Sequence, residues 1–366
     1  MRVAIVTEDV VGRRMAGPGI RAWHFARELS KRFEVVLVAR LRELDRSTAF
    51  DAVEWGTPAA RSAMRSAAVV VGQPHRELLA VRHPRAIYDL FDPVVLELDE
   101  MIRRRPAMRL RVHRSLQWGR LAVALRQGWR LIAGAPRQLD FYLGVHAARV
   151  GDLSSWLGKW IEVPFGAERA PAIPPAVPAG PPVVVWGGGT WEWLDPQLAV
   201  DAVDRLNAVG VPARLLFLGG RHPNHSIAGA TLASGPRRDW LLRNDQWVPY
   251  DERGAWLSCC RASVILHRRT AEAEMSLRTR VFDAIAYGIP VVASRGGWAA
   301  DLVEQERIGV VVEPESLVSV AGALRRLIED DAFHASCVSN LENLRPRFAW
   351  AVVVRPLAEA IERVNE

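Results

Sequence analysis

Cysteine is scarce in this sequence: only Cys259, Cys260 and Cys337 occur among its 366 residues. Three cysteines cannot build a disulfide framework, and the adjacent pair lacks the spacing of a zinc knuckle or a redox motif. Long apolar runs are missing as well. The first one ends at Thr7, too early for a secretory signal, and no later stretch approaches the roughly eighteen uncharged apolar residues of a membrane span. We therefore expect a cytoplasmic protein, with peripheral contact at the inner membrane face left open.

Lysine is nearly absent, occurring only at Lys31 and Lys159, although lysine and arginine together number 48 and the formal net charge is +7. This positive charge suggests nucleic-acid binding. However, the sequence shows no helix-turn-helix, zinc-finger or RNP pattern, and arginine-rich composition with abundant alanine, glycine and proline is typical of a GC-rich coding sequence. We therefore predict no nucleic-acid partner, and a basic nucleic-acid-binding protein is the non-enzyme alternative.

The chain is long enough for two domains of ordinary size, and its 49% hydrophobic and 24% charged residues are typical of a globular protein. Seven prolines between Pro164 and Pro182 are too many for a packed element and indicate a boundary. We predict a first domain over 1–164, a proline-rich linker over 165–182 and a second domain over 183–345. A C-terminal helix at about 346–366 is predicted to pack back on the first domain.

Short apolar runs alternate with amphipathic stretches in both halves of the chain. This alternation is typical of parallel sheets covered by helices. The predicted strands lie at 3–7, 33–39, 67–71, 86–90, 183–186, 213–218, 264–266, 290–293 and 310–312. The predicted fold class is therefore α/β, with two Rossmann-like domains whose parallel sheets face an interdomain cleft. Ligands are expected beyond the carboxyl ends of the strands.

The stretch from Leu96 to about Arg130 is predicted to be one long helix, and it is rich in arginine. Its arginines are interleaved with apolar residues and include Arg103, Arg104, Arg105, Arg109, Arg111, Arg114 and Arg120. These side chains either form a solvated helical face or receive an anionic or membrane-bound acceptor.

The run from Arg278 to Ala293 is the most informative segment. It predicts a short helix that ends at Gly288, after which Pro290 leads into a buried strand. The start of a helix offers free backbone N–H groups and the positive end of the helix dipole, and both suit a phosphate. Asp283 lies about one turn further on, where a carboxylate can accept hydrogen bonds from ribose hydroxyls. The alternative is a surface helix with an incidental aspartate.

The same run resembles the C-terminal signature of family-four glycosyltransferases of the GT-B fold, which reads Glu, seven residues, Glu, then Ala-Met-Ala-x-Gly-x-Pro-Val. Residues 186–196 and 218–224 resemble a bacterial branch of that family. The resemblance implies transfer of a sugar from a nucleotide-diphosphate donor, with retention at the anomeric carbon and without a metal. It implies no cofactor, because the nucleotide sugar is a co-substrate.

The resemblance also assigns donor contacts in the second domain. The second acid of the signature corresponds to Asp283, which is expected to hold the ribose, and the backbone at Ser276 and Leu277 is expected to face the diphosphate. Where the first acid would contact the donor sugar, this chain has a methionine. The neighbouring Glu272 and Glu274 are the candidates for that role.

Many family members clamp the diphosphate with an Arg–Lys pair after the first strand of the second domain. This chain has glycines there instead, including Gly188 and Gly189. Another cation must then neutralise the leaving diphosphate, because catalysis depends on stabilising its developing charge. The candidates are Arg280, Arg221, Arg278, His267 and Arg268. In the first domain, the loop with Gly17 and Gly19 resembles the glycine-rich loop that approaches the donor phosphate.

Family members often carry a histidine near the sugar at the end of a middle N-terminal strand. This chain has Asp89 and Asp92 at that place. These carboxylates either orient the substrate or cap the following helix. The predicted catalytic residues are Asp89, Asp92, Glu272, Glu274 and Arg280.

Together these features predict a retaining, metal-independent glycosyltransferase of the hexosyltransferase type. Its second domain would bind the nucleotide sugar, and its first domain would bind a sugar, a lipid-linked or a small-molecule acceptor. The alternative enzyme is a nucleotide-sugar epimerase or a pseudo-glycosyltransferase on the same scaffold, since a fold does not determine a reaction.

Overall fold

The computed structural model describes residues 1–44, 49–151, 153–154, 156–170, 174, 176–191, 193–219, 238–244 and 246–365. The chain forms two compact units. The first comprises Met1–Gly166, Met275–Leu277 and Trp350–Glu366, and the second comprises Ala167–Glu274 and Arg278–Ala349.

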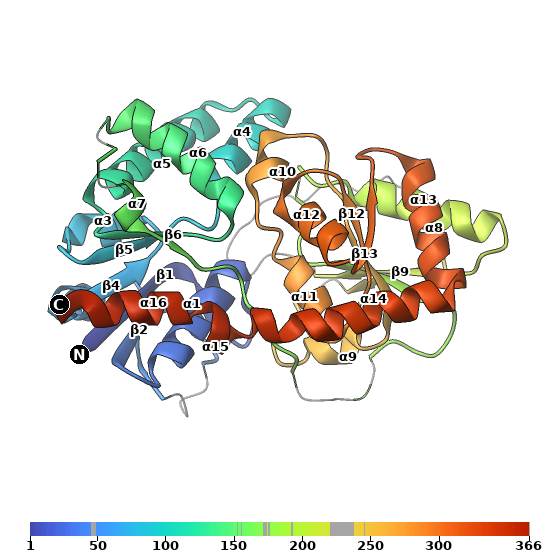
Figure 1. The fold of residues 1–366 in the computed structure, drawn as a ribbon, viewed down its shortest axis with the longest axis horizontal. Helices are drawn as coiled ribbons and strands as arrows, with labels where there is room; N and C mark the ends of the chain where they lie inside the picture. Colours follow the sequence, from blue (N-terminus) through green and yellow to red (C-terminus); the bar gives the residue numbers. More distant parts are fainter. Residues whose placement is uncertain are drawn as a thin grey trace. The chain divides into compact units, whose positions relative to one another are not determined.

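The first unit is built on a seven-stranded parallel sheet with the order β3-β2-β1-β4-β5-β6-β7 (Figure 1). The strands are β1 (Arg2–Gly12), β2 (Glu34–Arg42), β3 (Asp51–Glu54), β4 (Val69–Gly72), β5 (Ala86–Asp89), β6 (Arg130–Ala133) and β7 (Trp160–Glu162). The central strands are apolar and buried on both faces, as parallel strands between helix layers must be. All four strands predicted for this half are therefore confirmed.

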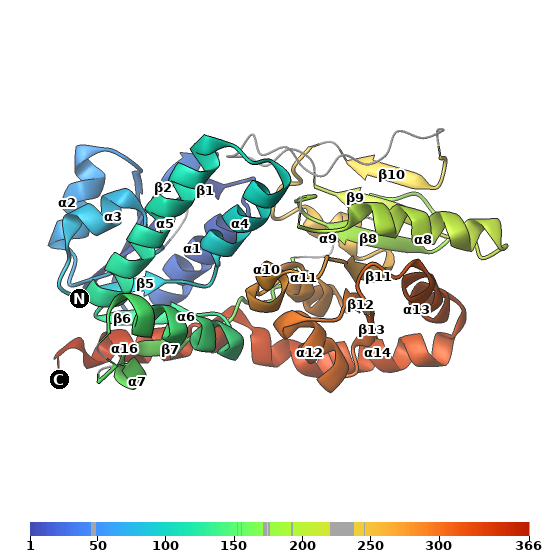
Figure 2. The same ribbon diagram turned by 90° about the horizontal axis from the view of Figure 1, so that it is seen from above.

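Helices cover both faces of this sheet (Figures 1 and 2). On one face lie α1 (Gly17–Leu29), α15 (Trp350–Val353) and α16 (Arg355–Glu362). The core beneath the other face includes residues of α2 (Pro58–Ser66), α3 (Arg76–Val81), α4 (Val94–Arg104), α5 (Met108–Gln127), α6 (Pro136–Arg149) and α7 (Trp156–Lys159). The ring of His24 stacks on Trp350 at 4.2 Å between centroids, which holds the last helices against α1.

The prediction of one long helix from Leu96 to about Arg130 is wrong. The structure has two helices, α4 and α5, separated by 105–107. Pro106 explains the break, because proline has no backbone N–H for the helical ladder and restricts the residue before it to extended conformations. Arg105 accordingly has φ −133° and ψ 78°.

The second unit is built on a six-stranded parallel sheet with the order β10-β9-β8-β11-β12-β13. Its strands are β8 (Val183–Gly187), β9 (Arg214–Leu218), β10 (Leu241–Asn244), β11 (Cys260–Ile265), β12 (Val291–Ser294) and β13 (Gly309–Val312). The five strands predicted for this half all occur. In each sheet the strand order reverses, between β1 and β4 and between β8 and β11, and such switch points leave room for ligands beyond the carboxyl ends.

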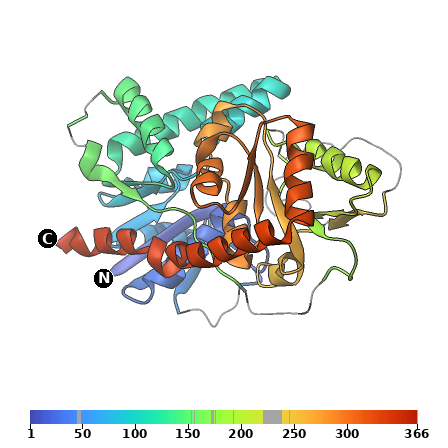
Figure 3. The same cartoon turned by 45° about the vertical axis from the view of Figure 1, so that its right-hand side comes forward.

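Helices also flank the sheet of the second unit on both sides (Figures 1 and 3). One side carries α8 (Pro196–Ala208) and α13 (Leu317–Glu329), which pack against each other. The other carries α9 (Arg253–Leu257), α10 (Ala271–Met275), α11 (Arg280–Tyr287) and α12 (Gly297–Gln305). The helix α14 (Asp331–Leu344) and the 3-10 turn η1 (Arg345–Phe348) follow and contact α11.

Candidate functional site

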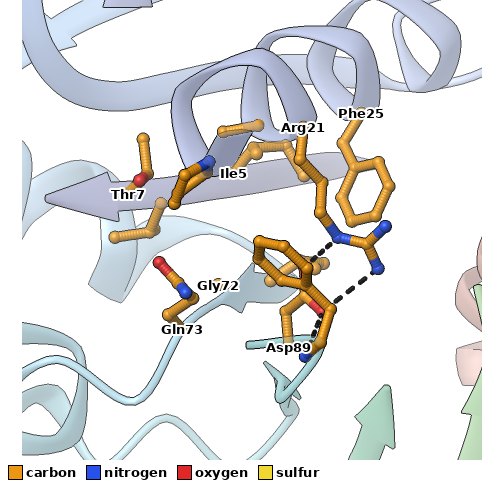
Figure 4. A pocket seen from close by; sticks show the side chains of 12 residues that line it. Ile5, Thr7, Arg21, Phe25, Gly72, Gln73 and Asp89 are labelled. Atoms are coloured by element: carbon orange, nitrogen blue, oxygen red, sulfur yellow. Dashed lines mark hydrogen bonds and ion pairs between the residues drawn. The ribbon is translucent and has the colours of Figure 1, made fainter. Parts of the chain in front are cut away.

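The carboxyl end of β5 carries a buried ion pair. Asp89 is the last residue of β5, and Arg21 reaches it from α1. Arg21 Nε donates to Asp89 Oδ2 at 2.6 Å, and Arg21 Nη2 donates to Asp89 Oδ1 at 3.1 Å (Figure 4). This two-pronged geometry is the strong arrangement for a guanidinium and a carboxylate.

Arg21 also has partners other than Asp89. Its Nη1 and Nη2 donate to the carbonyls of Pro164 and Val163, each at 2.8 Å. Its guanidinium carbon lies 4.6 Å and 4.7 Å from the ring centroids of Phe25 and Phe91. Arg21 therefore ties α1 to β5 and to the segment after β7, and Asp89, predicted to orient a substrate, is its carboxylate partner. A contact between Asp89 and a substrate stays a prediction.

The remaining predicted residues of the first unit lie around the same edge. Gly17 and Gly19 belong to the first turn of α1 rather than to a loop, because α1 already begins at Gly17. A Cβ on Gly19 would stand 2.2 Å from the Val10 carbonyl oxygen, so this glycine lets α1 pack directly on β1. Next to this turn is a cavity of about 20 Å³, which has room for about one water molecule.

Asp92 stands in the turn between β5 and α4. The N-cap of α4 is Pro93, and it makes no side-chain capping bond. Neither aspartate therefore occupies the N-cap position of α4, and the oxygens of Asp89 accept from Arg21 instead. Burial raises the pKa of Tyr142 well above its usual value, and the charges of Asp92, Asp89 and Glu97 add to the effect.

In the second unit, Arg280 lies at the carboxyl end of β8. It is the first residue of α11, and its Nη2 donates to the Gly189 carbonyl at 2.9 Å. Its guanidinium carbon is 4.8 Å from the ring centroid of Trp186, which is fully buried. The chain reaches Gly189 through Gly188, whose φ of 78° is easily adopted only by glycine.

Arg280 is a cation with few compensating partners. Its Nη1 is buried and has no hydrogen-bond partner among the residues that the structure describes. Burial, together with the charge of Arg278, lowers the pKa of Arg280 to about 9, which still leaves it positive at neutral pH. An anion placed here would relieve both the missing hydrogen bond and the uncompensated charge.

Asp283 lies one turn after Arg280 and is held from a second helix. Arg253 Nη1 of α9 donates to Asp283 Oδ1 at 2.8 Å. Burial raises the pKa of Asp283, and the charges of Arg253 and Arg280 oppose that shift. Sequence reasoning missed Arg253, because it stands thirty positions earlier and no motif surrounds it. The guanidinium of Arg253 also lies 4.2 Å from the ring centroid of Tyr250.

Both candidates for the first acid bind groups of the protein. Glu272 is fully buried, and both its oxygens accept from Arg278, at 2.8 Å and 2.6 Å. Glu274 Oε2 accepts from the Gly297 amide at 3.1 Å, at the start of α12. Because Arg278 is paired with Glu272, its charge is already balanced within the protein. Contact of either acid with a donor sugar stays a prediction.

The second unit matches a known protein family. The family described as glycosyl transferases group 1 matches residues 181–330. Sucrose-phosphate synthase 4 of Arabidopsis thaliana is 35% identical over 71 residues, which are 19% of this chain and 7% of that protein. This chain therefore spans only a small part of the curated relatives that it matches.

Solved structures match the whole chain at low identity. The structure of HepE from Anabaena in complex with UDP-glucose has a TM-score of 0.71 at 14% identity, and it covers 99% of this chain and 100% of its own. Sucrose-phosphate synthase from Thermosynechococcus elongatus has a TM-score of 0.67 at 15% identity, over 100% and 99% of the two chains. Residues 181–330 are therefore similar to the glycosyl transferases of group 1. The chain as a whole has the GT-B fold.

Within residues 181–330 the other predicted cations differ from Arg280. Burial and the charge of Arg278 lower the pKa of His267 to about 4, so this imidazole is neutral at neutral pH. A role for His267 in offsetting a diphosphate stays a prediction. Arg268 lies 3.9 Å from Asp195 and 3.6 Å from Glu315. Arg221 falls outside the residues that the structure describes.

Ser276 and Leu277, predicted to face the diphosphate, group with the first unit. Leu277 is buried, and the side chain of Gln138 lies close by. Gln138 Nε2 donates to the Met275 carbonyl at 2.9 Å. Their contact with a donor stays a prediction.

The buried pair of the first unit predicts a large stability effect. Asp89→Ala leaves the buried Arg21 without its carboxylate, so we expect a loss of about 3–5 kcal/mol in the free energy of unfolding. Urea denaturation measures it. The double variant Arg21→Met/Asp89→Leu removes both charges and should lose much less. A single-variant loss below about 1 kcal/mol would contradict the assignment of Asp89 as a structural partner.

The lowered pKa of His267 predicts a pH dependence of stability. The unfolded chain binds a proton near the usual value of 6.5, whereas the folded one resists protonation down to about 4. Stability is therefore lost as the pH falls from 6.5 towards 4. The variant His267→Asn has no group that titrates in this interval, so its free energy of unfolding should fall by about 3 kcal/mol less than that of the unmodified protein. Urea unfolding at several pH values measures both. Parallel losses in the two proteins would show that His267 is not the cause.

Proposed function

We propose that this protein is a retaining, metal-independent glycosyltransferase that uses a nucleotide-diphosphate sugar as its donor. The observation that carries the proposal is Arg280, a half-buried cation at the carboxyl edge of the second sheet whose Nη1 has no hydrogen-bond partner among the described residues. The group 1 match and the UDP-glucose bound to the structurally similar HepE support a nucleotide-sugar donor.

The donor contacts follow from the charges of α11. Arg280 would bind the diphosphate with the Nη1 donor that lacks a partner, and the glycine backbone at Gly188 and Gly189 would allow close approach of the phosphates. Asp283, positioned by Arg253, would accept hydrogen bonds from the ribose hydroxyls. When the glycosidic bond to the leaving phosphate breaks, negative charge grows on the diphosphate, and a fixed guanidinium stabilises it.

Retention and the acceptor site rest on the family resemblance. We propose a front-face route without a covalent nucleophile, and the pairing of both Glu272 oxygens with Arg278 supports it. The first unit would bind a sugar, lipid-linked or small-molecule acceptor, with Asp92 at the carboxyl edge as its candidate contact.

The donor contacts predict the effects of two substitutions on nucleotide affinity. Arg280→Met removes a charged hydrogen bond and should weaken binding of nucleoside diphosphates by about 10- to 100-fold. Asp283→Ala should weaken binding of the same nucleotides by about tenfold, because the ribose hydroxyls of a nucleoside diphosphate lose their hydrogen bonds to this carboxylate. Isothermal titration measures both, with a thermal-shift screen to choose the nucleotide.

Arg269→Met is the matched control, because Arg269 is an exposed arginine of the same domain that pairs with Glu313. It should bind nucleotides like the unmodified protein. If no nucleoside diphosphate or nucleotide sugar stabilises the protein, the donor site is wrong. If Asp283→Ala leaves affinity unchanged, the ribose is placed wrongly.

Product analysis tests the reaction itself. The protein is incubated with a panel of nucleotide sugars, with alkyl glycosides and lipid-linked saccharides as acceptors, and with or without EDTA. We expect transfer that EDTA does not reduce and a product with the anomeric configuration of the donor, by NMR. Asp92→Ala should lower transfer but not nucleotide affinity. An altered free donor sugar without transfer would instead identify an epimerase, and inversion would contradict the proposed mechanism.

A further inference from the structure

The helix α5 exposes an apolar stripe on its outer face. This helix lies beside α4 and α6 in the first unit (Figures 1 and 2). The exposed fractions of its large apolar side chains are 73% for Met108, 54% for Val112, 57% for Leu116 and 36% for Val123. Spacings of four, four and seven residues bring these side chains onto one side of a helix.

The core contacts of α5 lie on the opposite side. Leu121, Ala124 and Leu125 are buried and belong to the core cluster beneath the sheet. A surface helix of a globular protein normally has one apolar face and presents polar residues opposite to it. The helix α5 is apolar on both faces, so the outer stripe needs an explanation other than packing within the unit.

Basic residues flank the stripe and acidic residues are missing from this helix. The sequence of α5 contains no aspartate or glutamate and has five arginines, Arg109, Arg111, Arg114, Arg120 and Arg126. Arg114 pairs with Asp99 of α4 at 2.5 Å. Within the part of the chain that the structure describes, no ion pair engages the other four.

We infer that α5 docks on the surface of a lipid bilayer with anionic headgroups. Its stripe would enter the boundary between headgroups and acyl chains, while the long arginine side chains reach the phosphates beside it. Charge complementarity selects this occupant, since the helix offers cations without a carboxylate to repel the lipid. A nucleic acid would use the arginines but would leave the apolar stripe exposed to water.

The helix would lie on the bilayer rather than cross it. Among the residues that the structure describes, no helix is long and apolar enough to span a membrane. This inference does not depend on the transfer reaction, because lipid binding is measured without a donor or an acceptor.

Vesicle co-sedimentation tests the apolar stripe. The full chain is mixed with vesicles of phosphatidylglycerol and phosphatidylcholine, and with vesicles of phosphatidylcholine alone. We expect binding to the anionic vesicles and about tenfold weaker binding for Val112→Ser/Leu116→Ser. The matched control is Val209→Ser/Val318→Ser, in which two valines of the second unit that are 62% and 68% exposed are replaced. This control should bind like the unmodified protein.

A second pair of variants tests the charges. Arg109→Gln/Arg111→Gln should weaken binding to anionic vesicles by about tenfold. Added salt should reduce the difference in affinity between this variant and the unmodified protein, because salt screens the charges. The control Arg347→Gln/Arg363→Gln removes two exposed arginines elsewhere and should have no effect. All variants should keep the melting temperature of the unmodified protein, because the replaced side chains are exposed.

Three outcomes would overturn the inference. Equal binding to both kinds of vesicle would exclude recognition of anionic headgroups. Unchanged binding of Val112→Ser/Leu116→Ser would exclude the stripe as the contact. Binding to duplex DNA, but not to anionic vesicles, would show that the arginines serve a nucleic acid instead.

Discussion

Burying a guanidinium is energetically unfavourable, and the positions of elements in both units depend on how buried arginines are paired. In the first unit, Arg21 meets that cost with Asp89, two backbone carbonyls and two aromatic rings. In the second unit, Arg278 meets it with Glu272. A buried charge without such partners is strongly destabilising, so these pairs determine where α1, β5 and the segment before α11 can lie. Arg280 differs because, among the residues that the structure describes, it forms no ion pair with a carboxylate, although the charges of Asp283 and Glu272 act on it.

The sequence predicted the positions of most strands, because a parallel strand covered by helices is a short continuous apolar run. It did not predict β3, β6, β7 or β10. These strands have three or four residues, and β3 and β10 carry charged or amide side chains at their ends. Runs of such mixed polarity do not stand out from turns.

The candidate site was predictable only where its residues are adjacent in the chain. Arg280 and Asp283 share one turn of α11, so the motif placed them together. The partners Arg253 and Arg21 come from other elements, and nothing in the local sequence indicates which carboxylate each one meets. For the same reason, Asp89 and Glu272 were predicted as catalytic residues on position alone, although the fold pairs each of them with an arginine.

Periodicity also could not assign the face that α5 buries. Apolar residues occur on two sides of this helix, and a wheel alone does not distinguish the side that meets the core from the side that meets another surface. The structure decides it through Leu121, Ala124 and Leu125. The arginines that the sequence left as either a solvated face or a docking surface then gain a geometric context, because they border a second apolar stripe.

The way Arg280 is held suits a cation that must act on a leaving group. A carboxylate partner would fix its position but would also neutralise it, and a diphosphate would then have to compete with that carboxylate. Arg280 is instead held by a neutral carbonyl, Gly189, and by the face of Trp186. Both contacts orient the guanidinium while leaving its net charge in place. The electrostatic cost of that arrangement is borne by the folded protein before any ligand arrives, and this is how a preorganised site stabilises charge that develops in a transition state. Lysine in the same position would keep the charge but lose the planar group that can donate to Gly189 and to a phosphate at once.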